Sequence, residues 1–203
     1  YLQDPIEQVF VAADGKLGSG ADAYYMPDNL GNAKNYGFEI DVVKYIRHFG
    51  IKANYTYTHS RITTSKREYK EGSAEYKTGV TQSRPLVNQA PHTANLSLLY
   101  KDTNYGWNAQ LAASYTGTKL ALVSPFKDAD QAMFGLDFSM EKKFSCGVSV
   151  FLKANNLLDA KRERYLKTVN QSNIEYEGQS SDKTIVETYK YGRTYLVGVR
   201  VKI

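Results

Sequence analysis

The sequence predicts an all-β protein: an antiparallel up-and-down meander of about eight strands belonging to a transmembrane β-barrel. Three observations predict this fold. Apolar residues recur with period two, no segment keeps a helical apolar period for three turns, and short connections alternate with longer ones. Most of the predicted strands, at 7 to 15 residues, also exceed the usual globular length of about 5 to 6.

Eight segments show the alternation, each bounded by turn-forming residues. In the strand around Tyr36–Val42, for example, aromatic and aliphatic residues alternate with Gly37, Glu39 and Asp41. The strands are predicted at residues 6–11, 36–42, 51–60, 93–101, 107–115, 132–141, 148–154 and 189–203.

The connections alternate in length along the chain. They are short at 46–50, 102–104 and 143–146, medium at 119–130, and long at 63–90 and 157–187. Greek-key sandwiches place long and short links at both ends, whereas outer-membrane barrels have short periplasmic turns and long extracellular loops. The alternation therefore predicts a membrane barrel with its short turns and Ile203 in the periplasm.

Charged residues such as Glu39, Asp137 and Arg200 alternate with the apolar ones and would line a wet lumen. Aromatic residues gather near the predicted strand ends, where interfacial girdles belong. Alternation alone fits a second fold equally well. A soluble β-sandwich or lipocalin-like module, binding a small ligand or glycan with its Tyr-rich surface, therefore stays open as the alternative.

The composition excludes other classes of protein. The chain has 203 residues, 42% hydrophobic and 23% charged, which is enough to bury a core in one large or two small domains. The net charge of +5 comes from interleaved charges of both signs, so nucleic acid is not an expected partner. The longest apolar runs are a few residues, whereas a spanning helix needs about 20.

Signatures of catalysis and of bound cofactors are missing from the sequence. The single cysteine, Cys146, permits no internal disulfide and has no zinc-type spacing around it. There is no nucleophile elbow, paired acidic motif or glycine-rich phosphate loop. We therefore predict that the chain is not an enzyme and binds no cofactor.

Several segments, taken in order, carry a resemblance to a known family. They are residues 32–40, which open a strand, 53–58 in the next strand, 85–92 after the long loop, 155–159 at a strand exit, and the Gly198-x-x-Val201-x-Ile203 ending. Together they resemble the C-terminal barrel region of TonB-dependent outer-membrane receptors, particularly those of Bacteroidetes-type bacteria.

The resemblance implies a function for the parent protein. Residues 1–203 would be a C-terminal barrel segment, without the plug domain, in the outer membrane of a Gram-negative bacterium. The parent would import a scarce nutrient: an iron chelate, haem, cobalamin or a glycan. Its partners would be outer-membrane lipid, lipopolysaccharide and the TonB complex, the last through the plug domain.

The long loop 63–90 and its borders hold the candidate ligand residues. Anionic or catecholate-like groups suit charge-assisted hydrogen bonds and stacking, which favours an iron chelate over a glycan. His59 and His92 flank this loop and are weak metal candidates, since imidazole at a wet interface needs no metal. The ligand-facing candidates are Arg61, Arg67, Tyr69, Tyr76 and Arg84.

Overall fold

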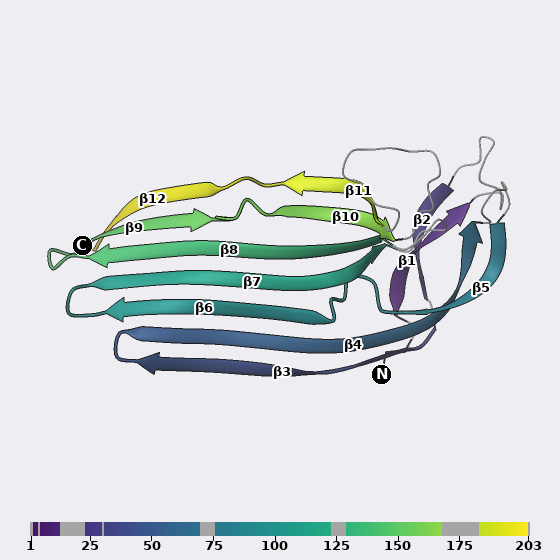
Figure 1. The fold of residues 1–203 in the computed structure, drawn as a ribbon, viewed down its shortest axis with the longest axis horizontal. Coiled ribbons are helices and arrows are strands. Elements are labelled where there is room, and N and C mark those ends of the chain that lie inside the picture. The colour runs from purple at the N-terminus through teal and green to yellow at the C-terminus, as the bar shows by residue number, and fades with distance from the viewer. Residues whose placement is uncertain are drawn as a thin grey trace.

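Long antiparallel strands form one sheet in the computed structural model of the chain (Figure 1). The structure describes residues 2–3, 5–12, 23–29, 31–69, 76–122, 129–167 and 183–202. No helix of membrane-spanning length and hydropathy occurs among these residues. The predicted all-β antiparallel meander is confirmed, and the sheet is open rather than closed into a barrel.

The strands follow the chain as a meander, with some further pairings. Strands β3, β4, β6, β7, β8 and β9 pair in sequence, β12 pairs with β9, β10 pairs with β8 and β11, and β5 pairs with β4. Strands β1 and β2 form a separate two-stranded sheet. The bounds are β1 Ile6–Ala12, β2 Ala23–Asn29, β3 Ala33–Ile46, β4 Phe49–Tyr69, β5 Tyr76–Arg84, β6 His92–Asp102, β7 Trp107–Leu122, β8 Ala129–Lys143, β9 Val148–Asn155, β10 Lys161–Lys167, β11 Lys183–Lys190 and β12 Thr194–Val201.

The three predicted short turns lie together at one end of the sheet, which we call the turn end; the C-terminus lies there too (Figure 1). At the opposite end, the extended end, strands continue past the predicted loop boundaries and β1, β2 and β5 are found. The predicted asymmetry between the two ends is therefore confirmed for the described residues.

The strand register puts the apolar residues of successive strands in rows on one face, which we call the apolar face. One row runs Val42, Ala53, Leu96, Ala113, Leu136 across five strands. Paired residues in antiparallel strands share a face, and residues two apart along a strand share it too. The apolar alternation of each strand is thus in phase with that of its neighbours.

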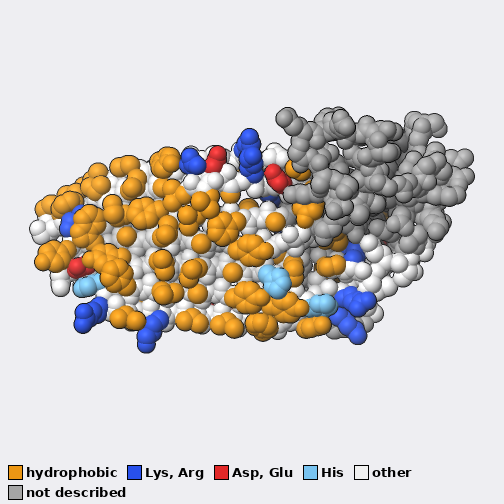
Figure 2. Space-filling model, viewed as in Figure 1, with side chains coloured by type: hydrophobic (Ala, Val, Ile, Leu, Met, Phe, Trp, Pro, Cys, Tyr) orange, Lys and Arg blue, Asp and Glu red, His pale blue; other side chains and the backbone are white. Residues whose placement is uncertain are grey.

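Nothing among the described residues covers the apolar face. Phe38 is 54% exposed, Leu98 49% and Val197 69%. Figure 2 looks onto this face: hydrophobic side chains cover the long strands, while Lys, Arg, Asp and Glu lie toward the ends and edges. A wide apolar face bordered by charge is what a lipid-facing barrel wall requires.

The opposite face, the polar face, carries hydrogen-bonded polar side chains. Asn95 donates to Asn54 (2.8 Å), Gln110 donates to Ser97 (3.2 Å), and Arg200 forms an ion pair with Glu141 (3.0 Å). These pairs join neighbouring or nearby strands across the sheet. This face is suited to a water-filled lumen, as the sequence predicts.

The strand count and loop limits need correction. The predicted loop 63–90 contains the end of β4 and all of β5, and 157–187 contains β10 and the start of β11. Strand β7 likewise continues to Leu122, into the predicted 119–130 connection. Where both faces of a strand meet water, backbone pairing can continue without apolar alternation, and the sequence pattern then cannot reveal it. With β2 also unforeseen, the described residues form twelve strands where about eight were predicted.

The chain crosses the sheet for the last two times as β9 followed by β10 and as β11 followed by β12. Each crossing is interrupted between its two strands, and the two interruptions lie side by side. Strand β9 ends before 156–160 and β11 ends before 191–193, with left-handed backbone at Asn156 (φ 54°) and Gly192 (φ 73°). Asn156 donates through Nδ2 to the Gly192 carbonyl (2.9 Å), and its Oδ1 accepts from the Ala160 amide (2.8 Å). Arg193 donates through Nε to the Leu157 carbonyl (3.0 Å). Side chains thus replace the missing ladder bonds.

We expect Leu96→Arg to reduce the folded protein recovered with membranes, because an arginine on the lipid-facing side of a barrel, as the sequence predicts for this face, costs about 2–4 kcal/mol near the bilayer midplane. The matched control is Ser97→Arg, one residue on and on the polar face. Heat-modifiable electrophoretic mobility of the membrane fraction measures the folded population. Equal loss in both variants would contradict the assignment of faces.

We expect Asn156→Ala to lower the free energy of unfolding by about 2–4 kcal/mol, from two lost hydrogen bonds and an alanine forced into left-handed backbone. Asn155→Ala is the control, since Asn155 makes one exposed bond to Thr194 Oγ1 (3.1 Å). Denaturant titration in lipid vesicles compares the two. A loss for Asn155→Ala as large as for Asn156→Ala would show that the interruption is not stabilised as described.

Candidate functional site

The extended end is built around a long hairpin of β4 and β5. Strand β4 runs 21 residues, and its outer part pairs with β5 from Ile62↔Arg84 to Tyr69↔Tyr76. The register shifts between Lys66 and Glu68, opposite Gly79, whose φ of 74° is left-handed. An extra residue with a glycine in this conformation is typical of a β-bulge. The bulge adds twist to the hairpin and lets it bend away from the sheet.

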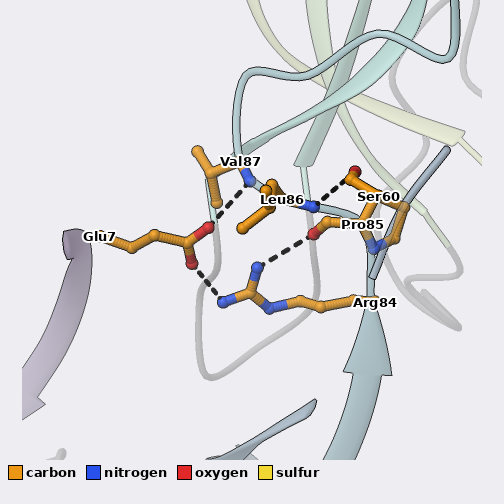
Figure 3. Close-up of polar contacts among 6 residues, drawn as sticks. All are labelled: Glu7, Ser60, Arg84, Pro85, Leu86 and Val87. Carbon is orange, nitrogen blue, oxygen red and sulfur yellow. Dashed lines mark hydrogen bonds and ion pairs between the residues drawn. The ribbon is translucent and has the colours of Figure 1, made fainter. Parts of the chain in front are cut away.

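A polar junction ties this hairpin to β1 and to the segment that enters β6 (Figure 3). Arg84, at the end of β5, forms an ion pair with Glu7 of β1 (Nη2 to Oε2, 2.5 Å) and donates through Nη1 to the Pro85 carbonyl (3.1 Å). The second Glu7 oxygen accepts from the Val87 amide (3.0 Å). One carboxylate therefore holds both the end of β5 and the chain after it.

Burial makes this junction energetically important. The side chains of Arg84 and Glu7 are 4% and 8% exposed, and removing one partner of a buried ion pair leaves the other charge uncompensated. Ala33, Ile62 and Leu86 form a small hydrophobic cluster in the same region, and the Leu86 amide donates to Ser60 Oγ (3.1 Å). The junction thus combines apolar packing with satisfied polar groups, although Arg84 Nε has no partner.

The predicted ligand residues fall into three situations. Arg84 is buried in the junction. Arg61 is exposed and donates through Nε to Ser83 Oγ (2.6 Å). It pairs with Lys34 of β3, and this register puts both residues on the apolar face. The remaining three candidates lie in the outer hairpin, where the structure describes the backbone and not the side chains: Arg67, Tyr69 and Tyr76.

The histidines contact tyrosines at the border of the apolar face. The His59 ring stacks on Tyr36 with centroids 4.9 Å apart, and His92 Nδ1 lies 2.8 Å from the Tyr55 hydroxyl. No group of three or more His, Cys, Asp or Glu side chains that would suit a metal occurs in the described part of the chain. Through these contacts, His59 and His92 occupy positions typical of aromatic residues at a membrane interface.

Sequence reasoning missed Glu7 and Ser60, the residues that organise the junction. Glu7 lies 77 positions before Arg84 and 80 before Val87. In the sequence, Glu7 is one polar residue within a segment that alternates between polar and apolar residues. A pairing between residues so far apart leaves no local signal, so only the fold reveals it.

An open antiparallel sheet with an exposed apolar face, a polar opposite face and one extended end defines the wall of an outer-membrane-type barrel. The comparison with protein families agrees: residues 2–157 match the TonB dependent receptor-like, beta-barrel family. The chain therefore belongs to that family, whose members are transport receptors of the Gram-negative outer membrane rather than catalysts. Comparisons with curated proteins and with solved structures gave no match.

We expect Glu7→Ala to open the junction, because the loss of one partner from a buried ion pair costs about 3–5 kcal/mol. Amide hydrogen exchange in residues 85–91 should accelerate at least about tenfold. Glu141→Ala is the control: its partner Arg200 is 67% exposed, and an exposed pair contributes about 0–1 kcal/mol. An unchanged exchange rate in Glu7→Ala would show that the junction does not anchor the hairpin.

Proposed function

We propose that residues 1–203 are the C-terminal barrel segment of a TonB-dependent receptor of Bacteroidetes type, and that this receptor imports an iron chelate. The family match over residues 2–157 supports the receptor family. The resemblance of residues 155–159 and of the chain ending to the family's last strands supports the C-terminal placement. The plug domain and its contact with the TonB complex belong to the rest of the receptor.

The topology we propose puts the turn end in the periplasm and the extended end outside the cell. Short turns on one side and extended strands on the other are the arrangement of outer-membrane barrels. In this orientation Lys34 and Arg61 emerge just beyond the Tyr36–His59 pair, on the lipid side of the wall. Two cations there suit the phosphates of lipopolysaccharide.

The ligand would meet the outer part of the β4–β5 hairpin. Tyr69 and Tyr76 are paired across the two strands, so their positions are fixed by the ladder rather than by a loose loop. Together with Arg67 they offer stacking surfaces and a charge-assisted donor, which suit a ferric catecholate or another anionic chelate. Arg84 serves this site by anchoring the base of the hairpin.

We expect Arg67→Ala to weaken ferric-chelate binding about tenfold or more, the size of one charge-assisted hydrogen bond. Arg61→Ala is the matched control, because Arg61 lies at the base of the hairpin and donates to Ser83, so the affinity of this variant should change less than about twofold. The measurement is binding and uptake of a radiolabelled ferric catecholate by cells that carry the full receptor.

Two results would count against the proposal. Unchanged uptake in Arg67→Ala, with normal receptor abundance, would remove the hairpin arginine from the ligand site. Cells without the receptor that still take up the chelate at the normal rate would remove iron chelates as its substrate. Labelled haem, cobalamin and glycans are then tested in the same uptake assay.

A further inference from the structure

A hollow of about 620 Å³ opens at the turn end, between two neighbouring hairpin turns. Its walls come from the β6–β7 turn and from the end of β8 with the turn that follows. The Lys143 amide donates to the Gly106 carbonyl (2.8 Å), which ties the two turns together. The hollow is therefore held by backbone contacts.

Lys142 is the central cation of this hollow. Its Nζ lies 4.8 Å from the centroid of the Trp107 ring and 5.7 Å from that of Phe144, and it donates to the Tyr105 carbonyl. An ammonium group has three donors, so this one bond leaves others for a ligand. The two rings and the carbonyl fix the position of the ammonium group.

The charge of the hollow is positive. Lys101 and Lys143 also line it, although their register puts them on the polar face, and the carboxylate in its wall is that of Asp102. Asp102 is buried (7% exposed), and its Oδ1 accepts from the amides of Asn104 and Tyr105 (3.0 Å each). These bonds hold the Asp102 carboxylate to the turn, and three lysines against one carboxylate leave the hollow positive.

The hollow lies where the apolar face ends. Lys142 pairs with Trp107 on one side and Val150 on the other, and Val150 pairs with Val199, so the ammonium group is on the lipid side of the wall. Tyr105 is 71% exposed and Phe144 48%, and aromatic residues at this level sit among lipid headgroups. A ligand here would have its charge in the hollow and its apolar part on the valines.

We propose that this hollow binds the phosphate of an anionic glycerophospholipid. The phosphodiester accepts hydrogen bonds from Lys142, while Lys101 and Lys143 add positive potential from the polar face, and the glycerol and first methylenes contact Trp107 and Phe144. The acyl chains continue along the apolar face toward Val150 and Val199. This site is independent of the nutrient site, because it lies at the opposite end of the strands.

The test uses the full receptor, purified in a non-ionic detergent and analysed by native mass spectrometry with phosphatidylglycerol or phosphatidylcholine of identical chains. Lys142→Gln should lower phosphatidylglycerol binding about fivefold, the factor for one lysine at an anionic surface. Lys142→Arg should retain it. Lys44→Gln is the matched control, since Lys44 lies on the apolar face near the turn end, away from the hollow.

Three results would overturn the proposal: phosphatidylglycerol binding in Lys142→Gln equal to wild type, an equal loss in Lys44→Gln, or phosphatidylcholine binding as strong as phosphatidylglycerol in the wild-type receptor. The headgroup comparison needs no substitution, so it stands even where Lys142→Gln folds poorly. Glycerol 1-phosphate added without lipid should bind weakly. Equal occupancy by it would assign the site to a free phosphate ester instead.

Discussion

The structure depends on one constraint: in contact with lipid, every backbone amide and carbonyl must find its partner in the ladder of the sheet. The ladder fixes the register, and the register fixes which side chains share a face. Rows such as Val42, Ala53, Leu96 follow directly from it. A slip of one residue between two strands would turn a whole strand's apolar side chains toward the lumen. The alternating sequence, the strand register and the lipid-facing surface therefore depend on one another.

Where the ladder stops, particular side chains take over its hydrogen bonds. Asn156 does so at the interruption of β9, where it bonds to Gly192 and Ala160. Glu7 does so at the extended end, where it bonds to Arg84 and Val87. Both follow the rule that a buried polar group without a partner costs more than the bond itself yields. The two sites thus extend the same constraint to places where the strands end.

The sequence was sufficient to predict the spanning part of the fold because lipid enforces the alternation there. Strand residues 36–42 and 93–101 were found for that reason, and the short turns with them. It was insufficient for β5, β10 and the junction, because strands outside the bilayer need no apolar alternation and Glu7 acts at long range. The same limit applies to the ligand residues proposed from the sequence. Arg84 is buried in an ion pair with Glu7, and a contact between residues so far apart leaves no signal in the local sequence.

The length of β4 connects this wall to its function. A strand needs about 9–11 residues to cross the bilayer, whereas β4 has 21, so about half of it projects beyond the membrane. The projecting half is paired with β5 and anchored at its base by Arg84 and Glu7. A site on paired strands is held more precisely than one on a loop. The hairpin therefore carries the backbone of Tyr69 and Tyr76 at a place fixed by strand pairing, where the β-bulge bends it away from the sheet.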